Sequence, residues 1–378
     1  SFRGLVDDQP VLVSNCERHH FSHRRVNYCS HVDTSHVKFH IPLDVPLIAP
    51  MALGLGGNAV TVGLPLWRAM EEHGASSGVN ASASGMALAK VIAGRRERGL
   101  PPLRFGVVHP ESGHNYELRY WLTASGVDTT RDIEIVVVPP PFLPDALGAG
   151  RVDGYCVGEP FNSVAIARGV GRIVTIKSSI WRSSPEKVLG VRREWAERFP
   201  EQMAAVIRAI TRAARWCGDP DNHDTLARVL SREDRLGISS AILMRALTGR
   251  LYIGDKEIID VPDFFLPFER AANFPWISHA LWFYSQMVRW QQVGHSTENA
   301  HKAAGTYRPD IYRAALDGMG IAVPSANSKV EGALAEATAL GAQGGRLMLG
   351  PDGFFDGAQF DPEALDLYIA SQALPSGQ

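Results

Sequence analysis

Residues 133–162, IEIVVVPPPFLPDALGAGRVDGYCVGEPFN, hold two apolar runs, IEIVVV and VDGYCVG, on either side of the short segment PDALGAG. The runs are rich in β-branched residues and end at proline or glycine, which is typical of strands, whereas PDALGAG predicts a short helix. Upstream, RFGVV (104–108) predicts a strand and YELRYWLTASG (116–126) a helix. Downstream, SVAIARG (163–169) and GRIVTIK (171–177) continue the series. Strands that alternate with helices at this spacing predict βαβ units and a mainly parallel sheet.

The flanking segments predict a second ordered region. Residues 45–62, VPLIAPMALGLGGNAVTV, combine an apolar run, a glycine-rich turn and a strand-like end. Residues 187–195 predict a strand that leads back out, residues 200–217 a helix with one apolar stripe, and residues 276–290 a strongly apolar helix that packs in the core. The basic stretch GRRERGLPP (94–102) has the composition of a linker.

These patterns predict an α/β protein with two lobes, because 378 residues exceed one ordinary core. We place lobe one at 45–100 and 190–378, and lobe two, as an insertion, at 101–189. Residues 1–44 form an atypical N-terminal segment. They contain six of the thirteen histidines and two of the four cysteines without clear helical periodicity. A solvated tail is favoured there over a metal site, because the ligands have no recognised spacing.

Composition excludes several classes of protein. With 38 basic and 40 acidic residues the formal net charge is -2, so there is no polybasic field for nucleic acid or anionic lipid. Four cysteines without a CxxC pair predict ordinary reduced or buried thiols. No window approaches the ~20 apolar residues of a membrane-spanning helix, and the first residues show no secretory signal. Because the chain has no polybasic field, any bound anion must be held by a few residues at one site.

The stretch RFGVVHPESGHNYELRYWL (104–122) contains the strongest candidate binding residues. A strand, a polar turn and a helix N-terminus bring free backbone N–H groups and the positive end of a helix dipole to one point, where an anion can bind. His114 can donate from its ring and Asn115 from its amide, while Ser112 caps the helix or contacts the ligand. The alternative is that His114 only completes the turn.

Three further segments offer polar groups. In GLGGNAVTV (54–62), glycines such as Gly57 let the backbone approach a ligand and Asn58 offers amide donors, while the absence of GxGxxG or GxxxxGK[ST] argues against nucleotide binding. Lys187 stands before an apolar run, from which its ammonium can reach a cleft, although a solvated lysine is equally compatible. Glu159 follows a strand, and helix capping is the preferred role over binding a cation or a partner. GxSxG, HExxH and EF-hand motifs are absent, so no catalytic residue is predicted.

Taken together, the segments 45–62, GHNYELRYWL, 133–162 and WRSSPEKVLGVRREW resemble the substrate-binding proteins of nitrate ABC importers and the related cytoplasmic nitrate sensor of bacterial nitrate-assimilation operons. The resemblance extends from Val45 to the FFDG and FDPE segments near the C-terminus. It implies a type II periplasmic-binding-protein fold, with a small anion held between two lobes and neither cofactor nor metal.

The resemblance also implies residue roles. His114 falls on the family's anion-binding histidine, Asn115 on a polar neighbour, Asn58 on an amide position and Lys187 on the cationic ligand. Lys187 favours nitrate or nitrite held directly, since bicarbonate-binding relatives tend to use calcium and acidic groups. Gly57, Ser112 and Glu159 are expected to lie next to these ligand residues and to hold them in position.

Residues 1–44 depart from the family pattern, which begins with a strand, an APL-containing helix and a tryptophan that contacts the anion. We expect the first strands of lobe one to be missing or replaced, as a shifted frame or rearranged gene end would produce.

Two functional classes follow from the sequence. The first is anion binding, either as the substrate-binding component of an importer with its permease and ATPase, periplasmic or membrane-associated, or as a cytoplasmic sensor with an antiterminator-type regulatory partner. The alternative is an enzyme like the thiamine-pyrimidine-precursor synthases, which share the fold but use cysteine and histidine clusters. No cysteine-rich run stands in the body of this chain, so binding without catalysis is the prediction.

Overall fold

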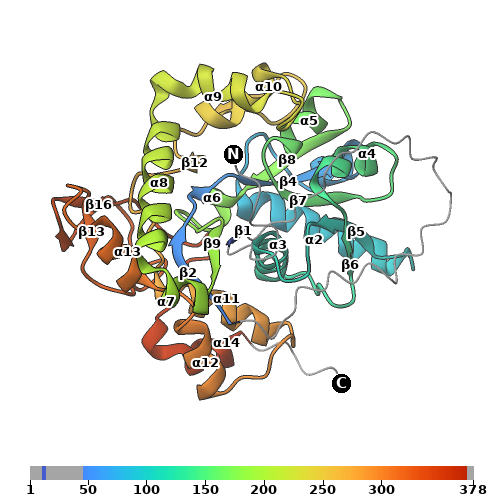
Figure 1. The fold of residues 1–378 in the computed structure, drawn as a ribbon. Coiled ribbons are helices and arrows are strands. Elements are labelled where there is room, and N and C mark those ends of the chain that lie inside the picture. Colours follow the sequence, from blue (N-terminus) through green and yellow to red (C-terminus); the bar gives the residue numbers. More distant parts are fainter. Residues whose placement is uncertain (1–10, 14–45, 373–378) are drawn as a thin grey trace.

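The computed structural model describes residues 11–13 and 46–372, which form a mixed α/β structure (Figure 1). Its largest sheet has five strands in the order β6-β5-β7-β4-β8. These strands are β6 (Ile133–Val137), β5 (Leu103–Val107), β7 (Gly154–Gly158), β4 (Asn58–Gly63) and β8 (Gly171–Ile176). β5 is parallel to β6 and β7, whereas β4 is antiparallel to both β7 and β8. Four strands therefore share one direction, which confirms the mainly parallel sheet.

The helices between these strands are α1 (Leu64–Glu72), α2 (Ala81–Glu97), α3 (Gly113–Ala124), α4 (Leu143–Gly148) and α5 (Phe161–Ala167), and α6 (Lys177–Ile180) follows β8. A single 3-10 turn, Pro140–Phe142, precedes α4. α2 continues into the stretch that the sequence predicted as a linker, and the loop begins only at Arg98.

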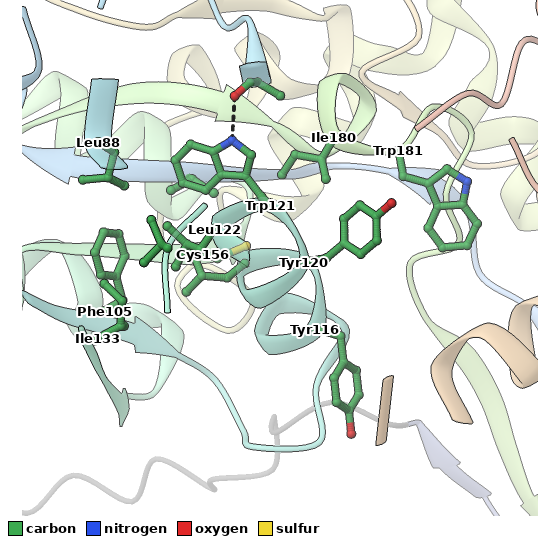
Figure 2. Close-up of a cluster of buried hydrophobic side chains, with 14 of the residues drawn as sticks. Leu88, Phe105, Tyr116, Tyr120, Trp121, Leu122, Ile133, Cys156, Ile180 and Trp181 are labelled. Atoms are coloured by element: carbon green, nitrogen blue, oxygen red, sulfur yellow. Dashed lines mark hydrogen bonds between the residues drawn. The ribbon is translucent and has the colours of Figure 1, made fainter. Parts of the chain in front are cut away.

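Helix α3 is anchored by its aromatic side chains. Figure 2 shows Trp121 and Tyr120 among apolar residues of the sheet and of α2, and all of the labelled side chains are buried. The indole Nε1 of Trp121 donates a 2.8 Å hydrogen bond to the carbonyl of Ala81 at the start of α2. Because interiors pack as densely as organic crystals, such a buried face holds the helix rigidly. The first turn of α3, which carries His114, is positioned by this packing.

The second sheet has the order β1-β9-β2 and is antiparallel throughout. Its strands are β1 (Val11–Val13), β9 (Val188–Arg192) and β2 (Leu47–Ala52). Buried residues of β2 and β9 share a core cluster with Met203 and Ile207 of α8 (Pro200–Gly218). The chain passes between the two sheets twice, at residues 53–57 and 177–187. Residues in both passages are therefore brought close together.

The C-terminal half contains the helices that the sequence predicted, together with short strands and loops. Its other helices are α7 (Arg193–Arg198), α9 (His223–Leu230), α10 (Ser240–Thr248), α11 (Ile277–Arg289), α12 (Thr297–Ala304), α13 (Pro309–Leu316) and α14 (Leu365–Ser371), with 3-10 turns at Pro220–Asn222 and Pro362–Ala364. Trp276 and Trp282 are buried, which confirms that the predicted helix at 276–290 packs in the core. Within residues 46–372 no helix is long and apolar enough to cross a membrane.

Short strand pairs complete the structure. They are β3 (Leu55–Gly56) with β12 (Phe265–Leu266), β10 (Arg250–Tyr252) with β11 (Ile258–Asp260), β13 (Val323–Pro324) with β15 (Ala342–Gln343), and β14 (Thr338–Leu340) with β16 (Leu347–Leu349).

The division into lobes at 45–100, 101–189 and 190–378 stays a prediction, and the strand pairing differs from it in one respect. β4 lies between β7 and β8, so the passage from one sheet to the other falls between β2 and β4 rather than near Leu100. The prediction for residues 1–44 falls almost wholly outside the described residues. Cys156 and Cys217 are free, as expected for ordinary thiols.

Candidate functional site

The N-terminus of α3 has the predicted arrangement of strand, turn and helix. β5 ends at Val107, and Ser112 is the N-cap residue, whose side-chain oxygen accepts a 3.2 Å hydrogen bond from the backbone N–H of Asn115. Serine favours this position because it satisfies one of the otherwise unpaired N–H groups of the first turn. His114 is the second residue of the helix and is buried. The dipole of a 12-residue helix thus places partial positive charge beside His114.

Asn58 lies at the start of β4 and bonds to two carboxylates. Its Nδ2 donates to Glu117 Oε2 at 3.0 Å and to Glu186 Oε2 at 2.7 Å. Because both acceptors are acidic, the amide can only be oriented with its NH₂ group toward them. The Oδ1 atom then points elsewhere and has no protein partner among the described residues. A Cβ added at Gly158 would stand 3.3 Å from Oδ1 and 3.9 Å from His114 Nε2, so glycine there keeps space open between these two groups.

Lys177 is the buried cation of the cluster. It begins α6 directly after β8, and its Nζ lies 2.6 Å from Glu117 Oε1 and 2.8 Å from Glu186 Oε2. Nζ also donates a 2.5 Å hydrogen bond to the carbonyl of Pro185, whereas its contact with Glu117 Oε1 is a close ion pair. Burial lowers the pKa of Lys177, but the attraction of the two carboxylates outweighs burial and leaves the pKa above its usual value. Lys177 is therefore charged at neutral pH.

Glu186 is the residue that connects the whole cluster. Besides Asn58 and Lys177, it bonds through Oε1 to Lys187 Nζ, and His114 Nε2 lies 3.7 Å from the same oxygen. Burial raises the pKa of Glu186, but the attraction of Lys177 and Lys187 is stronger, so the pKa falls well below its usual value. The Lys187 side chain is 32% exposed, whereas that of Glu186 is 7% exposed. The cluster thus opens to solvent on the side of Lys187.

His114 is neutral in this environment. Burial lowers its pKa from 6.5 to about 4; Lys187 and Lys177 act in the same direction, and Glu186 opposes them. Neither ring nitrogen has a hydrogen-bond partner among the described residues. A neutral imidazole carries one N–H and one lone pair, so His114 can donate a single hydrogen bond to an oxyanion.

The structure thus brings Asn58, His114 and Lys187 together around Glu186, and their role as anion ligands stays a prediction. The Asn115 side chain makes its hydrogen bonds elsewhere. Asn115 Nδ2 donates to the carbonyl of Pro110 at 2.6 Å, and its Oδ1 accepts from Arg119 Nε at 3.1 Å. The side chain is satisfied locally, by the turn that precedes the helix and by the next turn of α3. The sequence predicted the Asn115 amide as an anion ligand, whereas the structure shows it bonded to Pro110 and Arg119.

The three supporting residues also have definite positions. Ser112 caps α3. Gly57 has a φ of 88°, which favours glycine, and its carbonyl accepts a 2.9 Å hydrogen bond from the N–H of Glu159. Glu159 Oε2 in turn accepts from the N–H of Ser163 at 3.1 Å, as expected for helix capping. Burial raises the pKa of Glu159 to about 7.

Three members of the cluster were not predicted from the sequence: Glu117, Lys177 and Glu186. Glu117 stands three residues after His114, which places both on one face of α3. Lys177 follows the apolar strand GRIVTI, and Glu186 is the neighbour of Lys187. Helical spacing from His114 was the signal available for Glu117, whereas a search for anion ligands passes over acidic residues.

With this geometry in place, comparison with known proteins shows the family. Residues 36–231, just over half of the chain, match the model of the NMT1-like family. The chain belongs to the NMT1-like family. This NMT1-like chain is 30% identical over 283 residues to the nitrate/nitrite binding protein NrtA of Synechococcus elongatus, a match that covers 74% of the chain and 59% of NrtA. It is 37% identical over 192 residues to the bicarbonate transport ATP-binding protein CmpC of the same organism, covering 50% and 27% respectively. The NMT1-like chain therefore spans only about three-fifths of the length of this NrtA.

The fold is shared with a periplasmic nitrate-binding protein. The crystal structure of NrtA from Synechocystis PCC 6803 matches with a TM-score of 0.73 at 23% identity, covering 87% of this chain and 78% of that one. A ligand-binding component of an ABC-type import system from Staphylococcus aureus matches with a TM-score of 0.52 at 13% identity, covering 72% and 75%. The predicted periplasmic-binding-protein-like α/β fold and the resemblance to nitrate-binding proteins are both confirmed. These relatives are named for binding and transport.

Proposed function

We propose that this NMT1-like chain binds a small planar oxyanion, nitrate or nitrite, between its two sheets and releases it unchanged. The observation that carries the proposal is the meeting of the buried Asn58, His114 and Lys177 with the partly exposed Lys187 near the two passages between the sheets. An anion leaves water only where charged or hydrogen-bonding groups replace its hydration shell, and this cluster supplies them.

Each residue has a distinct role in the proposal. Lys187 reaches solvent and provides the full positive charge at the entrance. His114 donates one hydrogen bond from a neutral ring, and the N-terminus of α3 adds partial positive charge. Gly158 leaves room beside His114 Nε2, where an oxygen atom of the anion can accept the hydrogen bond of the imidazole.

As biological role we propose the substrate-binding component of an ABC importer for nitrate or nitrite. Support comes from the relatives, which include NrtA, a nitrate/nitrite binding protein, and the nitrate import ATP-binding protein NrtC of Synechocystis. A nitrate-sensing regulator would use the same anion site. We propose binding without catalysis because the Cys156 thiol is buried and burial raises its pKa well above the usual value, which opposes formation of a nucleophilic thiolate.

The test is a thermal-shift and calorimetric series with nitrate, nitrite, hydrogen carbonate with and without calcium, and an alkyl sulfonate. A ligand at 100 times its dissociation constant stabilises a protein by about 2.7 kcal/mol, which is readily detected. We expect stabilisation by nitrate or nitrite, and loss of most of it in Lys187→Met. Lys256→Met, which removes an exposed lysine on the loop between β10 and β11, is the matched control and should respond like the unmodified chain. Absence of a shift with every anion, or a Lys187→Met response equal to that of the control, would contradict the proposal.

A further inference from the structure

The Glu186 carboxylate lies where an anion ligand is expected. It takes hydrogen bonds from Asn58 Nδ2, Lys177 Nζ and Lys187 Nζ, and it is 3.7 Å from His114 Nε2. Asn58 lies on β4, Lys177 on α6 and His114 on α3, whereas Lys187 is the chain neighbour of Glu186. Three separate parts of the fold and the neighbouring lysine therefore converge on one acidic group.

We propose that Glu186 is an internal substitute for the anion, and that nitrate binds only when the Glu186 side chain moves aside. The inference rests on the proposed anion-binding function and names the residue that sets its affinity. A carboxylate and a nitrate ion are both planar, and each presents two oxygens to neighbouring donors in the same plane. Donors that hold one are therefore arranged to hold the other.

The backbone around Glu186 is fixed, so the movement is confined to its side chain. The N–H of Glu186 donates to the carbonyl of Gly54 at 3.0 Å, and the carbonyl of Lys187 accepts from the N–H of Leu53 at 2.7 Å. Both bonds tie this loop to the first passage between the sheets. The neighbouring Lys187 side chain reaches solvent, which gives the carboxylate a direction in which to rotate.

Charge balance indicates that a carboxylate must leave. The two lysines, Lys177 and Lys187, are matched by the two glutamates, Glu117 and Glu186, so an added anion would leave excess negative charge in a buried site, which is costly. Of the two glutamates, Glu117 belongs to the packed helix α3 and keeps its bond to Lys177. With Glu186 turned away, Lys187 is left without its carboxylate partner. The site then has a single uncompensated positive charge, which matches a monovalent oxyanion and disfavours a dianion such as sulfate.

The experiment is calorimetric titration of sodium nitrate into the unmodified chain, Glu186→Gln and Glu186→Asp at one pH and constant ionic strength. Glutamine keeps the size and loses the charge, whereas aspartate keeps the charge but is shorter by one C–C bond of about 1.5 Å. We expect both variants to bind nitrate more tightly, by about tenfold or more, because apparent affinity rises when the competent conformation is more populated. Glu194→Gln removes an exposed carboxylate from α7 and is the control for the change in overall charge.

The outcomes separate the two proposals. Nitrate affinities of both Glu186 variants that equal or fall below that of the unmodified chain overturn the internal-substitute role. Tighter binding by Glu186→Gln alone also overturns it, since charge removal would then be sufficient. Failure of all four proteins to bind nitrate would instead contradict the anion-binding function itself. Near-UV circular dichroism verifies that each variant is folded, and Glu186→Asp retains the negative charge if the glutamine variant is unstable.

Discussion

Replacing Lys177 with methionine tests whether the buried cluster acts as one unit. The substitution keeps the aliphatic stem but removes the ammonium that lies 2.6 Å from Glu117 and 2.8 Å from Glu186. Both carboxylates then remain buried, with side chains 3% and 7% exposed. Breaking a buried ion pair by removing one partner costs about 3–5 kcal/mol, and two stranded carboxylates place this variant at the upper end. The loss should shrink as pH falls, because protonation of a stranded carboxylate removes its charge.

Urea denaturation followed by tryptophan fluorescence measures this loss. Lys302→Met is the matched control, since Lys302 Nζ also lies 2.6 Å from a glutamate, Glu298, but the two side chains are 70% and 76% exposed. Removing an exposed pair changes stability by at most about 1 kcal/mol. Adding Glu117→Gln to Lys177→Met should recover more than half of the loss, because a single stranded carboxylate can still pair with Lys187. Equal losses in Lys177→Met and Lys302→Met, or no recovery in the double variant, would refute the view of a coupled buried network.

Three further expectations concern neighbours of the cluster. The pKa of His114 falls from 6.5 to about 4 on folding, so the unfolded chain binds the extra proton and stability decreases as pH falls through that window; His114→Gln should flatten this part of the urea-midpoint profile. The pKa of Glu159 rises to about 7, so the folded chain holds the proton and this contribution to stability is lost as pH rises from about 4.5 to 7. Glu159→Gln should remove that loss, and an unchanged slope would contradict the assignment. Gly158→Ala should weaken nitrate binding severalfold in calorimetry with little change in melting temperature, because its Cβ would stand 3.3 Å from Asn58 Oδ1; unchanged affinity would show that the space is not used.

Local patterns in the sequence were sufficient for most of the fold. The alternation around residues 133–162 predicted β6, α4 and β7, because apolar runs bounded by proline and glycine depend on nearby residues alone. The position of β4 was not accessible in this way. Its pairing with β7 and β8 joins segments roughly a hundred residues apart, and no local pattern encodes strand order.

In the candidate site, too, local sequence features could be predicted and long-range contacts could not. His114 could be predicted as a site residue because a strand, a turn and a helix N-terminus are local features, and Asn58 and Lys187 because they fall at strand starts. Asn115 was predicted as a ligand beside His114, whereas its amide bonds to Pro110 and Arg119 close by in the chain. Hydrogen bonds of this local kind compete with ligand binding for short polar side chains.

The acidic members of the cluster bear on which ligand the site selects. Two carboxylates that approach each other inside a protein, as Glu117 and Glu186 do, are a common way to hold a divalent cation. Here Lys177 Nζ stands between them and forms an ion pair with each, so the position that a calcium ion would require is taken by an ammonium group. An ammonium built into the chain cannot leave, whereas Glu186 beside the exposed Lys187 can rotate. The proposed exchange of the Glu186 carboxylate for a monovalent oxyanion would keep the number of buried charges unchanged, whereas an anion that enters with its own metal ion would add to that number.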